Sequence, residues 1–120
     1  MAGIKIVTDM DPETALQLAW RAAQDLSFTL TPIAGGSFCA SKGHSILSFL
    51  VGPAAPHCQF KIAAQKYPDG STDLVLERNN AWMSGRIGLR RIMAEAEALM
   101  QKAAEAIETN GSKVKERREI

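Results

Sequence analysis

The sequence predicts an α+β fold, in which an antiparallel sheet of about five strands carries two helices on one face. Two segments repeat apolar residues at helical spacing, and the segments between them alternate in polarity and end at glycine or proline turns. The chain has 120 residues, of which 46% are hydrophobic, so one domain with one core is expected. Both helices are placed on the apolar face of the sheet, because that arrangement buries all three apolar surfaces at once.

The chain begins with a short strand that is followed by a helix. Residues 4–8 are β-branched and alternate in polarity, which is typical of a strand. Asp11 is placed to cap a helix, and Pro12 suits the first helical position. The helix is expected over about residues 12–26, with these apolar residues at helical spacing: Leu16, Trp20 and Ala23.

The middle of the chain is rich in β-branched and alternating segments separated by turn residues. A glycine pair, Gly35 and Gly36, falls inside the first of these segments, where glycine indicates a bend in a strand. The expected segments are, in order, a kinked strand over 28–40, a turn at 41–44, a strand over 45–51, a loop at 52–56, a strand over 57–67, a turn at 68–70 and a strand over 72–78.

A long amphipathic helix is expected over about residues 84–108, where apolar residues recur every three or four positions. Asn110 and Gly111 are residues that end helices. We expect residues 1–111 to form the single domain. Residues 112–120 are highly charged and are expected to form a flexible tail.

The expected order of elements is β-α-β-β-β-β-α. Over residues 4–108 this order resembles the small helix-grip and TATA-box-binding-protein-like α+β domains. The resemblance concerns the order of elements and not a motif. It therefore implies a sheet gripped by a long helix, and it transfers no functional residue to this chain.

Charge and composition narrow the classes of function. Fourteen basic and thirteen acidic residues leave a net charge of +1, so neither a nucleic acid nor a membrane is expected as a partner. No apolar segment is long enough to span a bilayer, and the first residues do not match a secretory signal. We expect a soluble, cytoplasmic protein without a cofactor, in which Cys39 and Cys58 are reduced.

A metal site is not expected at the cysteines and histidines. Cys39, His44, His57 and Cys58 offer two sulfur and two nitrogen ligands. His57 and Cys58 are adjacent on an expected strand, so their side chains point to opposite faces and do not share one metal. No catalytic residue is assigned, because no acid that would complete a set with a cysteine and a histidine is identifiable.

The leading hypothesis for function is a non-enzymatic binding module. A small apolar or amphipathic ligand would lie between the sheet and the C-terminal helix, whose methionines would let the pocket adapt. The residues expected to line this pocket are Phe38, Phe49, Phe60, Ile62, Leu76, Met93, Leu99 and Met100.

Two further hypotheses remain open. The strand expected over 45–51 is apolar on both faces, so one set of its side chains lies on the far side of the sheet. A second copy of the chain would cover that set in a homo-oligomer, for example a homodimer. A hydrolase or transferase has the least support.

A possible anion site lies where the last middle strand meets the long helix. Helix N-termini and arginine side chains both favour phosphate or carboxylate groups. The candidate residues are Arg78, Ser84, Gly85, Arg86 and Arg90. The alternative is that the arginines pair with carboxylates of the chain itself, such as Asp73, Glu77 or Glu95.

Overall fold

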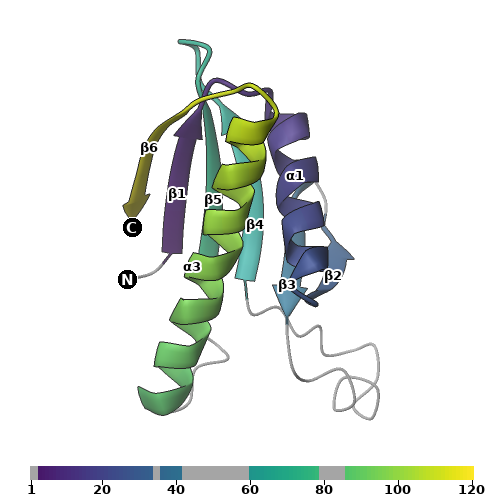
Figure 1. The fold of residues 1–120 in the computed structure, drawn as a ribbon, viewed down its shortest axis with the longest axis vertical. Coiled ribbons are helices and arrows are strands. Elements are labelled where there is room, and N and C mark those ends of the chain that lie inside the picture. The colour runs from purple at the N-terminus through teal and green to yellow at the C-terminus, as the bar shows by residue number, and fades with distance from the viewer. Residues whose placement is uncertain (1–2, 34–35, 42–59, 79–85) are drawn as a thin grey trace.

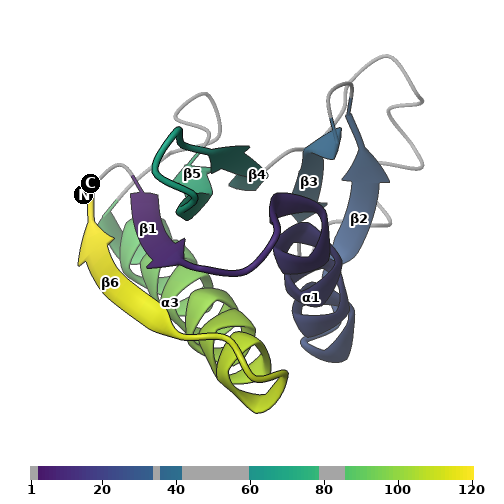
Figure 2. The same ribbon diagram turned by 90° about the horizontal axis from the view of Figure 1, so that it is seen from above.

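Two helices lie side by side on one face of a six-stranded antiparallel sheet (Figure 1). The computed structural model describes residues 3–33, 36–41, 60–78 and 86–120, and for residues 86–92 it describes the backbone only. Seen from above, the sheet curves around both helices, and no helix of the described part covers its other face (Figure 2). The predicted α+β fold with two helices on one face is confirmed, with six strands in place of about five.

The sheet joins strands from the two ends of the chain. The strands are β1 (Gly3–Thr8), β2 (Thr29–Pro32), β3 (Phe38–Ser41), β4 (Phe60–Lys66), β5 (Thr72–Arg78) and β6 (Val114–Glu119). Their order is β2-β3-β4-β5-β1-β6, and each neighbouring pair is antiparallel. β1 therefore lies between β5 and β6, and Gly3 N–H donates to the carbonyl of Ile120 at 3.2 Å.

Helix α1 (Pro12–Asp25) begins where the sequence predicts. The Asp11 carboxylate accepts hydrogen bonds from the backbone N–H groups of Glu13 at 3.2 Å and Thr14 at 3.4 Å. These bonds satisfy two of the donors that a helix start leaves unpaired. Small side chains let the helix lie close to its neighbours, and its buried residues are Ala15, Leu18, Ala19, Ala22 and Ala23.

Helix α3 (Arg86–Thr109) is the long C-terminal helix that the periodicity predicts. The helix ends at Thr109, and two residues later Gly111 has a φ of +90°, which is costly for residues with a side chain. Ser112 N–H donates back to the carbonyl of Ile107 at 3.2 Å, which closes the last turn. Its buried residues are Ala96, Leu99, Met100, Ala103, Ala104 and Ile107.

The helices and the inner face of the sheet enclose one apolar core. Alternate strand residues point inward, as the two-residue period of a strand requires. The inward residues that are buried are Ile4, Ile6, Phe38, Ala40, Phe60, Ile62, Leu74 and Leu76. The outward residues of the same strands include Lys5, Lys61 and Glu77, so the two faces of the sheet differ in polarity.

Residues 28–40 form a hairpin and not one kinked strand, which corrects the prediction. β2 and β3 pair antiparallel, with Leu30 opposite Ala40. Ile33 N–H donates to the carbonyl of Ser37 at 2.9 Å, and Gly36 has a φ of +84°. A glycine that adopts positive φ supports a reversal of the chain as readily as a bend, so the glycine pair did not distinguish the two.

Residues 112–120 also differ from the prediction of a flexible tail. Val114–Glu119 form β6, which pairs with β1, and Ile4 lies opposite Glu119. The turn predicted at 41–44 begins at Ser41, which is the last residue of β3. The rest of that turn, the strand predicted over 45–51, the loop at 52–56 and the first residues of the strand over 57–67 lie outside the described residues, from position 42 to position 59.

Candidate functional site

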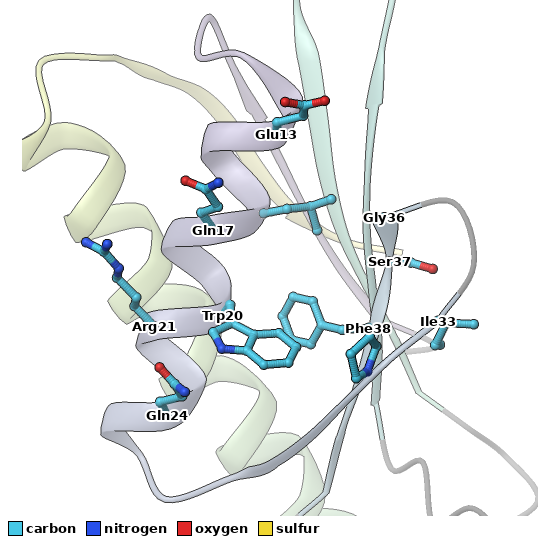
Figure 3. A pocket seen from close by; sticks show the side chains of 11 residues that line it. Glu13, Gln17, Trp20, Arg21, Gln24, Ile33, Gly36, Ser37 and Phe38 are labelled. Carbon is cyan, nitrogen blue, oxygen red and sulfur yellow. The ribbon is translucent and has the colours of Figure 1, made fainter.

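An open groove of about 670 Å³ lies between α1 and the β2–β3 hairpin (Figure 3). The groove lies between α1 and the strands β2 and β3 at one edge of the sheet. Figure 2 shows these two strands on the side of α1 that faces away from α3. The volume of the groove is within the range of small-molecule sites in proteins, roughly 300–1,000 Å³. We take this groove as the candidate functional site.

The floor of the groove is apolar and aromatic. Phe38 is buried on the inner face of β3, and Trp20 is half-buried on α1. The two rings meet edge to face, with centroids 5.1 Å apart and planes at 72°. Leu16, one helical turn before Trp20, extends the floor toward the start of α1. Edge-to-face packing of this kind stabilises an aromatic pair by about 0.5–1.5 kcal/mol beyond the area that it buries.

One wall of the groove is the β2–β3 hairpin. Pro32 and Ile33 are exposed, and the side chain of Ile33 is 37% accessible. Gly36 lies close to the floor, since a Cβ atom there would be in ordinary contact with Leu16 Cδ1, at 3.8 Å. Ser37, which is buried, completes the wall beside Phe38.

The opposite rim is a polar row on α1. Glu13, Gln17, Arg21 and Gln24 line the groove and follow one another at helical spacing. Figure 3 shows Gln17, Arg21 and Gln24 on one side of the helix, while Trp20 points toward Phe38. The groove therefore has an apolar floor with polar groups along one side.

A second group of polar side chains lies on the outer face of the sheet. Asp73 is 3% exposed, and it accepts a hydrogen bond from the Tyr67 hydroxyl. Lys5 Nζ lies 3.6 Å from Asp73 Oδ2. The hydrogen bond to Asp73, followed by the charge of the same carboxylate, raises the pKa of the Tyr67 phenol above its ordinary value of 10.0. This group lines neither the groove nor the smaller cavity between Ile4, Glu97 and β6, so we treat it as structural.

The turn before β5 holds a further titratable group. Asp69 Oδ1 accepts hydrogen bonds from the Ser71 hydroxyl at 2.6 Å and the Ser71 backbone N–H at 2.9 Å. These two bonds lower the pKa of the Asp69 carboxyl below its ordinary value of 3.8. The turn predicted at 68–70 is confirmed, and Gly70 in it has a φ of +92°.

The structure places most of the predicted ligand-binding residues in the packed core. Phe38, Phe60, Ile62, Leu76, Leu99 and Met100 are between 0% and 2% exposed and belong to one cluster. Met93 is half-buried against that cluster, and Phe49 lies outside the described residues. Of these residues, only Phe38 also lines the groove.

The predicted anion site is described in part. Arg78 is half-buried, and its Nη1 lies 3.9 Å from the sulfur of Met93. Ser84 and Gly85 lie outside the described residues, as do the side chains of Arg86 and Arg90. The suggested pairing of the arginines with nearby carboxylates therefore stays a prediction.

The cysteines differ from the prediction that both are reduced, because Cys39 on β3 is disulfide-bonded. His44, His57 and Cys58 lie outside the described residues. Within the described ranges, no three or more His, Cys, Asp or Glu side chains are grouped so that they could hold a metal ion.

Sequence reasoning missed the groove because it assigned Leu16 and Trp20 to the buried stripe of α1. The structure buries Leu18 and the alanines instead, and Ala23 is shared with the predicted stripe. The available signal was a helix with two apolar stripes, one of alanine and one of large side chains. The larger side chains lie beside the core and form the groove floor.

The chain matches no known protein family, no curated protein and no solved structure. In the described part, neither helix combines the length and the apolar composition that crossing a membrane requires. The resemblance to helix-grip and TATA-box-binding-protein-like domains stays a prediction from the order of elements.

Proposed function

We propose that this protein is a non-enzymatic binding protein for a small apolar or amphipathic ligand, held between α1 and the β2–β3 hairpin. The observation that supports this proposal is the groove of about 670 Å³ with Trp20, Phe38 and Leu16 on its floor. Removing apolar surface from water is favourable by about 25 cal/mol for each Å². An apolar ligand that covers this floor would be held by that effect.

The proposed position differs from the predicted one between the sheet and α3. Side chains there, such as Leu76, Leu99 and Met100, fill the space between the elements themselves. A ligand in that place would have to displace packed core side chains, which typically costs a few kcal/mol. The groove beside α1 requires no such displacement, because it is already open to solvent.

Replacing Ile33→Asp tests the position of the site. Ile33 lines the groove and is exposed, so a charge there makes one wall polar without entering the core. We expect this variant to bind the neutral dye Nile red about tenfold more weakly than the parent, which corresponds to about 1.4 kcal/mol. Fluorescence titration measures the affinity for the dye. Native mass spectrometry of the parent shows any ligand that co-purifies with it.

Thr31→Asp is the matched control, because Thr31 is exposed on β2, two residues before Ile33, and does not line the groove. It should bind the dye as the parent does. Equal affinity of the parent and the Ile33→Asp variant would contradict the proposed site, and a parent that binds no apolar probe would contradict the proposed function.

The alternative of a homo-oligomer stays a prediction. It depends on the strand expected over 45–51, which lies outside the described residues. The described outer face of the sheet carries charged side chains, with Lys61 opposite Glu77 and Lys5 paired with Asp73. Burying these charges against a second copy would cost free energy. Native mass spectrometry would give the oligomeric state directly. We propose no hydrolase or transferase reaction.

The predicted cytoplasmic location also stays a proposal. The disulfide at Cys39 favours an oxidising compartment instead, since disulfides persist there and are rare in the cytosol. Fractionation of expressing cells with a count of free thiols in each fraction would decide between the two locations.

A further inference from the structure

The groove has one basic and one acidic side chain among the described residues that line it. These are Arg21 and Glu13, and both belong to the polar rim on α1. They are eight residues apart, which places them about 12 Å apart along the helix axis. The two ends of the groove therefore carry opposite charges.

The charges of Glu13 and Arg21 are balanced differently. Glu13 is in the first turn of α1, where the positive end of the helix dipole offsets a carboxylate. Arg21 makes no ion pair with another described residue, although Asp25 follows it by one helical turn. Arg21 directly follows Trp20 on α1, and its side chain extends from the rim of the groove on the side away from Phe38 (Figure 3).

Further donors surround Arg21. Gln17 and Gln24 lie one helical turn before and after it on the same rim. Among the described residues, no partner accepts a hydrogen bond from the side chains of Gln17, Arg21 or Gln24, or from the indole N–H of Trp20. Arginine and tryptophan side chains can only donate, so a group that accepts hydrogen bonds suits this end of the groove.

We infer that the ligand of this groove is an amphiphile with an anionic oxygen headgroup, such as a carboxylate, and that Arg21 binds the headgroup while its apolar body covers Trp20 and Leu16. This inference rests on the proposed function, to which it adds the charge of the ligand. A guanidinium is the side chain best matched to a carboxylate, because it can donate two parallel hydrogen bonds. A cationic headgroup would meet Arg21 with a like charge.

Three probes that differ only in the headgroup test the inference: dodecanoate, methyl dodecanoate and dodecyltrimethylammonium. Their affinities are measured by displacement of Nile red at about pH 8, where the carboxylate is ionised. We expect Arg21→Glu to weaken dodecanoate binding about tenfold, to leave the neutral ester within about twofold, and to strengthen binding of the cation. Arg21→Lys should retain most of the affinity for dodecanoate.

Lys66→Glu is the control for overall charge. Lys66 is exposed on β4 and does not line the groove, and its replacement changes the net charge of the chain by the same amount. Its affinities for the three probes should match those of the parent. Dodecyl sulfate in place of dodecanoate then distinguishes a preference for carboxylate from a preference for any oxyanion.

The outcomes distinguish failure of the inference about the headgroup charge from failure of the proposed binding site. If Arg21→Glu weakens all three probes alike, or none of them, the anionic headgroup is excluded while the proposed function stands. If the parent prefers the cationic probe, the inference is wrong in sign. If the parent binds none of the probes, the inference and the proposed function fail together.

Discussion

The Tyr67 hydroxyl donates a hydrogen bond to Asp73. Because Tyr67 is the one tyrosine in the sequence, its ionisation can be followed by absorbance without a label. The phenol donates to a carboxylate that is 3% exposed, and this bond raises the pKa of Tyr67 above 10.0. Absorbance of the phenolate during an alkaline titration should therefore show a midpoint above 10.0 in the folded protein. In Asp73→Asn the midpoint should move down toward the ordinary value, because the carboxylate charge is lost.

The same contact makes stability depend on pH. The folded chain holds the phenol proton more tightly than the unfolded chain, so the stabilisation is complete below pH 10.0 and is lost as the pH rises through the folded-state pKa. Urea unfolding of the parent and of Tyr67→Phe should give free energies that differ at neutral pH and converge above that pKa. A constant difference across the alkaline range would show that the hydroxyl bond is not the cause.

Strand β6 is the element in which the sequence and the structure differ most. Its residues are nearly all charged, and Val114 is the half-buried exception at its start. Charged edge strands protect a sheet from pairing with other chains. Such a strand lacks the alternation of apolar and polar residues by which a strand is recognised in a sequence. What stabilises β6 is backbone pairing with β1, which leaves no mark in the side-chain pattern.

Hydrogen exchange tests β6 directly. The alternate amides of 114–119 that point toward β1 should exchange far more slowly than in the unfolded chain, whereas a flexible tail would exchange at the unfolded rate. Ending the chain at Lys113 should lower the free energy of unfolding by several kcal/mol, because each backbone hydrogen bond lost costs about 1 kcal/mol net. Removing Ile120 alone should have a smaller effect.

Other elements show why part of the fold could be predicted and part could not. Local signals defined α1 well, since Asp11 and Pro12 specify its start whatever packs around it. The direction in which α1 faces is a tertiary property, and the large side chains Leu16 and Trp20 proved a poor guide to it. The β2–β3 hairpin was missed because glycine permits both a bend and a reversal, and the pairing partner alone decides between them.

At the scale of the whole molecule, the two faces of the sheet have separate roles. The face with both helices (Figure 2) holds the core, and the groove lies at the edge of that face, between α1 and the β2–β3 hairpin. Cys39 belongs to the other face, because Phe38 and Ala40 beside it point into the core. The groove and the disulfide are thus on opposite sides of β3, and a change in one can be tested without altering the lining of the other.

The disulfide of Cys39 should contribute substantially to the stability of the molecule. The sequence has two cysteines, so the partner within the chain is expected to be Cys58, which lies outside the described residues. Closing a loop of about 20 residues stabilises a folded chain by about 3 kcal/mol, chiefly by restricting the unfolded state. Urea unfolding with a reductant should show a loss of about that size. The Cys39→Ser variant should match the reduced parent and should not respond to reductant. Free thiols in the denatured, unreduced protein would contradict the disulfide and would restore the argument for a cytoplasmic location.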